Sequence, residues 1–231
     1  MATLELRSRL DRLLERVAAA AARAGRDASE ITIVAVVKTV PVRLIEEAID
    51  AGITHVGENR VQEAFQKFAE IGPRVTWHMV GHLQRNKVNR ALEIFNVIQS
   101  VDSLRLAGAI SERAVTTRRV VDVLLEVNTS GEETKYGFAP DELCEAAEEI
   151  DRLEGLRTRG LMTVGPFVAD PEEARHSFVL LRNLRDRVST LGLANVEMRE
   201  LSMGMTNDFE VAVEEGATMI RVGTAIFGER Q

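Results

Sequence analysis

Residues 31–38 read Ile-Thr-Ile-Val-Ala-Val-Val-Lys, an apolar and largely β-branched run that ends in a lysine. A run of this length and composition predicts a β-strand that is buried on both faces. Amphipathic helical segments follow it and alternate with further short apolar runs along the rest of the chain. The stretch therefore opens a repeating strand–helix pattern, which is typical of a parallel sheet covered by helices.

Eight runs of this kind are expected to form strands. They cover residues 31–38, 54–58, 75–80, 97–101, 121–128, 156–164, 196–202 and 218–222. Helices are expected at about 41–51, 59–70, 84–93, 103–115, 140–152, 170–191 and 206–215. A final short turn or helix begins near Thr224, and an amphipathic helix at about residues 4–24 precedes the whole pattern and ends at Gly25.

Eight strands in succession favour a closed (β/α)8 barrel of the TIM type over an open sheet. An open doubly wound sheet usually carries a glycine-rich loop after its first strand, whereas residues 38–41 read Lys-Thr-Val-Pro. The expected architecture is an α/β fold with one domain over residues 1–231. The barrel occupies about 31–228, and the N-terminal helix is an addition to it.

The composition excludes several classes of function. The chain has 36 acidic against 29 basic residues, a net charge of −7 that argues against general nucleic-acid or anionic-membrane binding. A single cysteine, Cys144, excludes an internal disulfide framework. No apolar stretch approaches the ~20 residues of a membrane span, and the N-terminus lacks a signal-peptide pattern. We therefore expect a cytoplasmic protein, with a monomer as the default state.

The C-terminal ends of the strands hold the candidate site, because barrels carry their chemistry there. Lys38 is the clearest candidate. A lysine at the inner end of an apolar strand loses hydration, which lowers its pKa and favours a neutral amine that can form a Schiff base with a carbonyl. The alternative is a lysine that extends to solvent or pairs with an acid such as Glu58. Position alone gives the two interpretations equal weight.

The loops after the last two expected strands are the second candidate. Residues 202–208 read Ser-Met-Gly-Met-Thr-Asn-Asp, and residues 221–228 read Arg-Val-Gly-Thr-Ala-Ile-Phe-Gly. Both have hydroxyls and a glycine at a strand-to-helix junction, where backbone N–H groups can bind phosphate. The alternative is ordinary helix capping by Thr206 and Thr224. Arg221 is expected to point into the barrel mouth unless it forms a buried ion pair, for example with Glu200.

A lysine and two phosphate-type loops in one mouth indicate a phosphorylated carbonyl compound, either a sugar phosphate or pyridoxal 5′-phosphate (PLP). His78 is expected to be hydrogen-bonded inside the barrel, and His82 to line the mouth. No metal site is expected, because their spacing of four suits a metal pair only on a helix. Lys67 and Lys135 are expected on the surface.

Seven stretches carry a resemblance to one family. They are residues 35–39, 57–63, 77–87, 135–138, 160–162, 201–205 and 221–228. In these stretches the chain closely resembles the pyridoxal phosphate homeostasis protein family (YggS/PROSC-like proteins), which is related to the N-terminal barrel of alanine racemase. The resemblance runs from about residue 31 to residue 228.

The resemblance implies a PLP-bearing barrel in which Lys38 forms a Schiff base with the cofactor. It places Arg221 at the pyridine nitrogen and Asn59 close to the cofactor. The phosphate-cradle positions that it implies are Ser202, Met203, Gly204, Thr206, Gly223 and Thr224. Thr206 stands where the family usually has serine, and Arg60 where an aromatic residue is common.

The resemblance also implies a role in intracellular PLP (vitamin B6) homeostasis and amino-acid balance without established catalysis, so no catalytic residues are assigned. PLP-requiring apo-enzymes are the expected recipients. The residues agree with this, since a racemase needs a base on each face of the cofactor and only Lys38 is evident. The alternatives are a PLP-dependent, racemase-like enzyme and a Schiff-base aldolase acting on a sugar phosphate.

Overall fold

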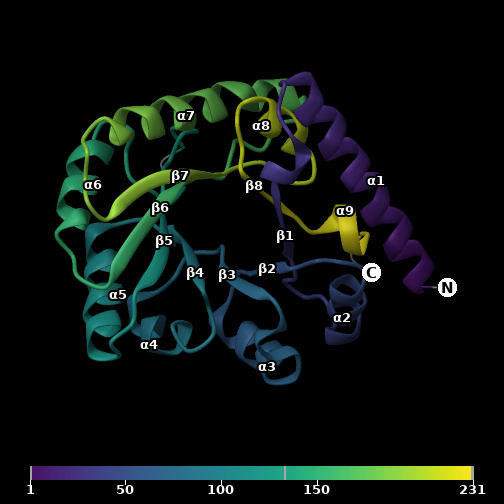
Figure 1. Ribbon diagram of the computed structural model, residues 1–231, viewed down its shortest axis with the longest axis horizontal. Coiled ribbons are helices and arrows are strands. Elements are labelled where there is room, and N and C mark those ends of the chain that lie inside the picture. The colour runs from purple at the N-terminus through teal and green to yellow at the C-terminus, as the bar shows by residue number, and fades with distance from the viewer. Residues whose placement is uncertain (1, 133, 230–231) are drawn as a thin grey trace.

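The computed structural model describes residues 2–132 and 134–229 (Figure 1). Its strands are β1 Thr32–Val36, β2 His55–Glu58, β3 Thr76–Met79, β4 Val97–Val101, β5 Val121–Glu126, β6 Leu156–Met162, β7 Val196–Ser202 and β8 Met219–Val222. Its α-helices are α1 Ala2–Arg23, α2 Val42–Asp50, α3 Val61–Ile71, α4 Val88–Ala91, α5 Leu104–Thr116, α6 Leu143–Asp151, α7 Arg175–Ser189, α8 Phe209–Glu214 and α9 Thr224–Phe227.

The eight strands are parallel and close into a barrel in chain order, which confirms the predicted fold class. β1 closes the ring by pairing with β8, in a register that sets Val34 beside Arg221 and Ala35 beside Val222. The helices surround the strands (Figure 1). Because β1 and β8 are neighbours, the turn that follows β1 lies against the turn that follows β8.

Several boundaries differ from the predicted ones, and turn chemistry explains the differences. β1 stops at Val36, because Thr39 adopts a φ of 62° and the Val40 N–H donates to the Val37 carbonyl over 3.0 Å. Lys38 therefore lies in a turn rather than at the strand end. The helix expected from residue 206 begins only at Phe209, so residues 206–208 also form a turn.

Two other expected helices begin with short 3-10 segments. The helix expected at 84–93 consists of a 3-10 turn, Arg85–Lys87, and the short α4. The helix expected at 170–191 starts with the 3-10 segment Pro171–Ala174, and α7 begins after it. Pro171 has no backbone N–H to donate and is therefore placed at the start of a helical turn.

The apolar core has two parts. Inside the barrel, Val34, Leu124, Met162 and Met219 form a small cluster. A larger core lies between the strands and the surrounding helices, with Trp77 among its fully buried side chains. The interior of the barrel is thus only partly apolar, which leaves room for polar side chains from several strands.

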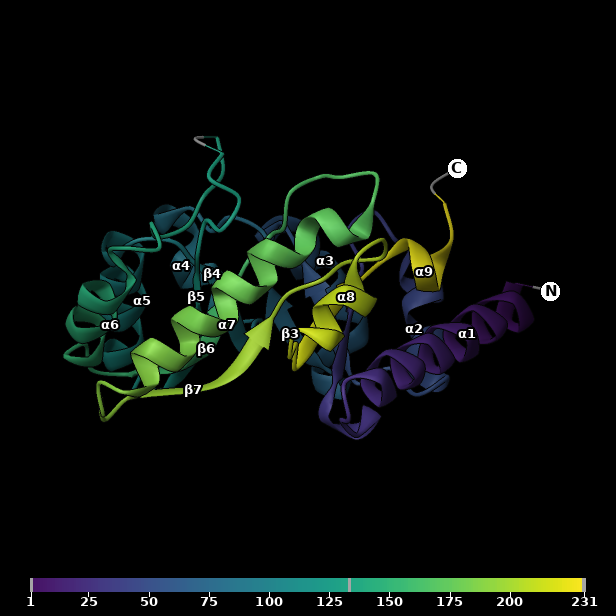
Figure 2. The ribbon, with the colours of Figure 1, turned by 90° about the horizontal axis from the view of Figure 1, so that it is seen from above.

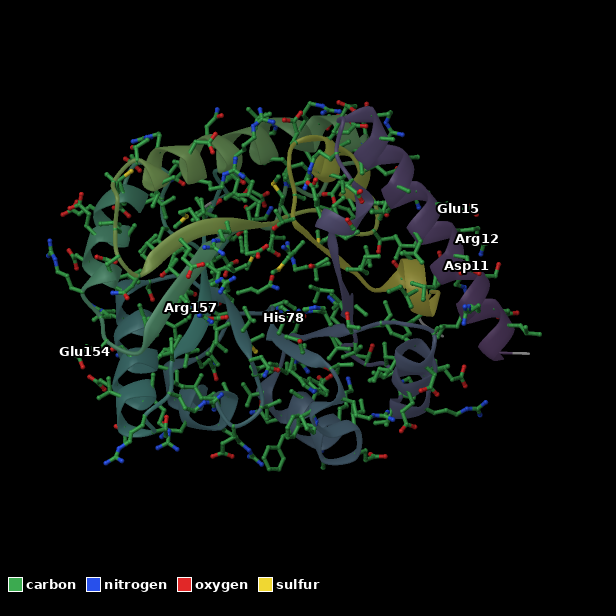
Figure 3. The ribbon with its side chains drawn as sticks, viewed as in Figure 1. Asp11, Arg12, Glu15, His78, Glu154 and Arg157 are labelled. Carbon is green, nitrogen blue, oxygen red and sulfur yellow. The ribbon has the colours of Figure 1, made fainter. Side chains whose placement is uncertain are left out.

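The N-terminal helix is amphipathic, as predicted. Leu6, Leu10, Leu13 and Val17 are buried against the rest of the molecule, whereas Leu4 is exposed. Spacings of three and four residues place the buried side chains on one helix face. α1 packs against α8 and α9, and its outer face carries Asp11, Arg12 and Glu15 (Figure 3).

The loops that follow β5 and β6 extend from the same side of the barrel as the short segment after α9 (Figure 2). This is the side at which the strands end, and it holds the sequence-predicted site. None of the helices in the described part of the chain combines the length and apolar character of a membrane span.

Candidate functional site

A cavity of about 1010 Å³ opens beside the ends of β1 and β8. Five predicted site residues line it, namely Lys38, Thr206, Arg221, Gly223 and Thr224. The start of α1 and the loop after β6 form other parts of its wall, through residues such as Leu6 and Phe167. Phe167 is 96% exposed, so the cavity has an apolar rim as well as a polar floor.

Lys38 is half-buried at the cavity wall, in the turn after β1. The alternative pairing with Glu58 is not present, because that carboxylate pairs with Lys67. Among the described residues, no carboxylate lies within ion-pair distance of the Lys38 amine. The next residue, Thr39, has a left-handed backbone, an uncommon state for a β-branched residue, and strain of this kind concentrates at functional sites.

The two strand-to-helix junctions contribute backbone N–H groups. In the part of the chain that the structure describes, those of Thr206, Asn207, Thr224 and Ala225 have no hydrogen-bond acceptor. Neither threonine caps its helix, because Asp208 precedes α8 and Gly223 precedes α9. Instead, the Thr224 hydroxyl donates to the Thr206 hydroxyl over 3.1 Å. Unbonded donors and two hydroxyls at one place fit an anion such as a phosphate.

Arg221 is the buried cation of the cavity lining. It is only 5% exposed. Its Nη1 donates to Ser202 Oγ over 2.7 Å, and its Nη2 donates to the Thr163 carbonyl over 2.6 Å. Burial lowers the pKa of the guanidinium to about 10, which still leaves it charged at neutral pH. The proposed pairing with Glu200 is absent, because that carboxylate accepts a hydrogen bond from Thr218 instead.

Four predicted positions do not line this cavity. Ser202 and Met203 are buried, and the Ser202 hydroxyl is shared between Gln99 and Arg221. Gly204 has a φ of +89°, and a Cβ there would lie 2.5 Å from the Ala212 side chain, so the glycine serves the packing of α8. Asn59 follows β2, and its N–H donates to the Glu58 carboxylate over 2.8 Å.

Lys67 is buried, whereas the sequence predicts it on the surface, so that prediction is wrong. It is 8% exposed, and its amine donates to the Val37 carbonyl over 2.6 Å and pairs with Glu58. On α3 its position resembles that of any charged helical residue, so the sequence carries no signal for this burial. Lys135 is half-buried, and its amine donates to the Gly165 carbonyl over 3.0 Å.

A second polar group lies at the barrel mouth outside the cavity. The sequence predicts His82 at the mouth but does not predict Glu126 there. His82 stacks on Tyr136 at a centroid distance of 3.9 Å, and its Nδ1 lies 2.7 Å from Asp102. Glu126 ends β5, and burial raises its pKa to about 7. A glutamate that closes an apolar strand run was the available signal, but the strand was expected to continue to Asn128.

His78 has the role predicted for it. It is buried, and its two ring nitrogens lie 2.9 Å from His55 and 2.9 Å from Gln99. The described residues contain no group of three or more His, Cys, Asp or Glu side chains that could hold a metal ion.

The sequence matches the family described as alanine racemase, N-terminal domain, over residues 8–231. Among its relatives, the pyridoxal phosphate homeostasis protein of Aquifex aeolicus is 44% identical, over 96% of this chain and 97% of the relative. The protein of the same name from Escherichia coli (strain K12) is 38% identical, over 96% of this chain and 95% of the relative.

Solved structures of similar proteins cover nearly the whole chain as well. PipY of Synechococcus elongatus, with PLP bound, has a TM-score of 0.81 and 37% identity, covering 93% of this chain and 99% of PipY. An unknown protein from Bifidobacterium adolescentis has a TM-score of 0.94 and 41% identity, covering 98% of this chain and 96% of that one.

An alanine racemase of Clostridium difficile has a TM-score of 0.74 but only 17% identity, covering 97% of this chain and 56% of the racemase, so it shares the fold alone. The two pyridoxal phosphate homeostasis proteins, by contrast, match nearly all of both chains. Their identities of 44% and 38% are higher than a shared fold alone requires. The chain therefore belongs to the pyridoxal phosphate homeostasis protein family, whose barrel is that of the alanine racemase N-terminal domain.

Proposed function

We propose that this protein binds PLP in the cavity, holds it as a Schiff base on Lys38, and serves intracellular PLP (vitamin B6) homeostasis. One observation carries the proposal: Lys38, Arg221 and the unbonded N–H groups of the two junctions line a single cavity. These groups match the three parts of PLP, namely an aldehyde, a pyridine nitrogen and a phosphate. The names of the relatives and the PLP bound to PipY support PLP over a sugar phosphate.

PLP, when bound, supplies an aldehyde that a primary amine can attack. Lys38 offers that amine, and no ion pair among the described residues has to be broken first. Thr206 and Thr224 offer hydroxyls and N–H groups to the phosphate. The Arg221 guanidinium can donate to the pyridine nitrogen. Because arginine stays charged, Arg221 would only donate to the ring nitrogen and would keep it unprotonated, and such a ring would be a weak electron sink.

We propose further that this role is not catalytic. Racemisation needs a base on each face of the cofactor, and Lys38 accounts for one. Asp208 is the buried carboxylate of the described cavity lining, and it accepts a hydrogen bond from the Met205 N–H at the phosphate junction. A cavity in which Lys38 is the described amine and the buried carboxylate is already bonded is suited to holding PLP and delivering it, with PLP-requiring apo-enzymes as recipients. The proposed setting is a cytoplasmic monomer that also affects amino-acid balance.

The first test is chemical trapping. Purified protein is incubated with PLP, and its visible absorbance and intact mass are measured before and after borohydride reduction. We expect one added PLP group per chain after reduction, and peptide mapping should locate it on Lys38 rather than on Lys67, Lys87 or Lys135. A protein that takes up no PLP, or that carries it on another lysine, contradicts the proposal.

Two further measurements separate the alternatives. A racemase-like enzyme predicts turnover of amino acids and solvent deuterium exchange at Cα by the PLP-loaded protein, and we expect neither. A Schiff-base aldolase predicts that reduction traps a sugar phosphate rather than PLP. A carrier predicts that PLP reaches an apo-enzyme faster from this protein than through free solution.

A further inference from the structure

A chain of hydrogen-bonded side chains crosses the barrel interior and ends at the cavity. Its members come from β2, β3, β4, β7 and β8 and are His55, His78, Gln99, Ser202 and Arg221. The three central members are at most 1% exposed. His78 lies in the middle of the strand ring (Figure 3). His55 is the first residue of β2, so the chain starts near the opposite end of the barrel.

The links are short and unbroken. His55 Nδ1 lies 2.9 Å from His78 Nε2, and Gln99 Nε2 lies 2.9 Å from His78 Nδ1. Ser202 Oγ lies 2.7 Å from Gln99 Oε1 and 2.7 Å from Arg221 Nη1. The second N–H of the Gln99 amide points to the Met219 sulfur at 3.7 Å. The Gln99 side chain therefore uses both of its N–H donors and its oxygen inside the barrel.

The charge on Arg221 sets the direction of every bond in this chain. A guanidinium only donates, so Ser202 Oγ accepts from it and must donate its own proton to Gln99 Oε1. The Gln99 amide then donates to His78 Nδ1, so the proton of a neutral His78 ring is on Nε2 and points to His55. Burial lowers the pKa of His78 to about 3, in agreement with a neutral ring.

This arrangement holds Arg221 through neutral contacts, while the Glu126 and Asp208 carboxylates act on the Arg221 pKa only from a greater distance. Among the described residues, its guanidinium contacts the Ser202 hydroxyl and the Thr163 carbonyl, and no carboxylate lies within ion-pair distance. A carboxylate partner would neutralise the charge where it is needed, whereas neutral acceptors fix the plane of the guanidinium and leave its charge available to the cavity.

We infer that His78 and Gln99 are positioning residues, which orient Arg221 toward the pyridine nitrogen of bound PLP through Ser202. Neither residue lines the cavity itself. The inference deepens the proposed function and rests on it, because only a bound pyridine ring gives the orientation of Arg221 a consequence. It assigns the polar centre of the barrel to the cofactor site rather than to folding alone.

The first experiment uses the unaltered protein without PLP and is independent of the proposed function. Nitrogen NMR of histidine-labelled protein should show His78 as a neutral ring with its proton on Nε2. Arg221→Met should disturb the His78 signals, because the donor that sets the direction of the chain is lost. A His78 ring protonated on Nδ1, or His78 signals that Arg221→Met leaves unchanged, overturns the inference.

The second experiment measures PLP binding in Gln99→Leu, which removes the middle link and leaves Arg221 in place. We expect the dissociation constant of PLP to rise about tenfold, which corresponds to the loss of roughly one hydrogen bond to a charged group. We also expect a changed pH titration of the visible absorbance of bound PLP. Reduction should still attach PLP to Lys38. Wild-type affinity and an unchanged titration in folded Gln99→Leu overturn the inference.

The matched control is Ser111→Ala, which removes a buried hydroxyl bonded to the Glu154 carbonyl at 2.7 Å on the outer helix α5. It should lower stability without changing the affinity or the absorbance titration of PLP. An equal spectral change in Ser111→Ala assigns the effect to general loosening and counts against the inference. If Gln99→Leu does not fold, the NMR comparison decides alone. If the unaltered protein binds no PLP, the proposed function fails while the NMR comparison still applies.

Discussion

Two lysines near the end of β1 lie in different surroundings. Lys38 lines the cavity, whereas Lys67 is buried beside Glu58. Lys67 donates to the Val37 carbonyl and pairs with Glu58, so its amine has two bonded partners. Lys38, the residue after Val37, has no such partner in the described part of the chain and faces a cavity of about 1010 Å³. A buried polar group without its bonds costs free energy. The bonded lysine therefore serves the fold, and the unbonded one is available to a ligand.

The same contrast extends along the barrel. The interior chain through His78, Gln99 and Ser202 uses its donors and acceptors within the protein. The junctions at Thr206 and Thr224 leave backbone N–H groups without acceptors among residues 2–132 and 134–229. Donors without acceptors occur at the cavity, and donors with acceptors occur in the barrel interior. This difference indicates where a ligand binds. The predictions below test this division, beginning with the largest expected effect.

Lys38→Met should abolish covalent retention of PLP, lowering it by about two orders of magnitude or more, because the one primary amine among the described residues of the cavity lining is lost. The free energy of unfolding should change little, since Lys38 makes no ion pair in the described residues. Intact mass after borohydride reduction and urea unfolding give the two readouts. Retention of reducible PLP by Lys38→Met would show that another amine reacts with PLP. The contrast drawn between Lys38 and Lys67 would then be wrong.

Lys67→Met should have the opposite pattern. Removing one partner of a buried ion pair leaves the Glu58 charge uncompensated, and we expect a loss of roughly 3–5 kcal/mol in the free energy of unfolding. Folded Lys67→Met should still attach PLP to Lys38. Asp122→Asn, which removes an exposed pair with Arg157, is the control and should cost about 1 kcal/mol or less. Similar losses of stability in both variants would show that the Lys67–Glu58 pair behaves like an ion pair exposed to solvent.

Glu126 lies between the two regions, since it is buried at the mouth but outside the cavity. Burial raises its pKa from 4.5 to about 7, so the folded state holds a proton that the unfolded state has already released. Its raised pKa favours the folded state below pH 4.5, and this advantage is lost as the pH rises through about 7. Glu126→Gln should therefore stabilise the protein by roughly 3 kcal/mol at pH 8 and hardly at all near pH 4.

Urea unfolding at the two pH values measures this effect. Glu148→Gln, an exposed change on α6, is the control and should show no such pH dependence. Equal effects of Glu126→Gln at both pH values would mean that the Glu126 carboxyl does not titrate in this range.

The smallest effect concerns the junction hydroxyls. Replacing Thr206 and Thr224 together by valine keeps the shape of the junctions and all their N–H groups. We expect PLP affinity to fall about tenfold and pyridoxal affinity to remain unchanged, because only PLP carries the phosphate. Thr116 and Thr117, replaced by valine at the end of α5, provide the matched control. Equal losses of affinity for PLP and pyridoxal would show that the phosphate does not bind at these junctions.

The sequence predicted most of the fold because strand and helix periodicities are local. β4 and β7 have the predicted bounds, Val97–Val101 and Val196–Ser202. The errors lie at element ends, where one turn changes the outcome. Thr39 in a left-handed conformation shortens β1, and the turn at 206–208 delays α8. Composition alone carries no signal for a strained threonine.

The candidate site was predictable only in part. Lys38, Arg221 and the two junction threonines line the cavity, because the end of a strand is a local property. Ser202 was expected beside them and instead bonds Gln99 and Arg221 inside the barrel. Whether a side chain at a strand end faces a cavity or the barrel axis depends on the stagger of all eight strands, which no single stretch encodes.

The sequence by itself determined that strands and helices alternate, that β1 and β8 become neighbours if the ring closes, and that a lysine and two phosphate-type junctions meet there. The tertiary structure decided which polar groups are bonded. It paired Lys67 with Glu58 and left Lys38 free of ion pairs in the described residues. It also joined His78 to Arg221 through residues distant in sequence. The physical reason is that hydrogen bonds and ion pairs form over about 3–4 Å, so their partners are fixed only when the ring of strands closes.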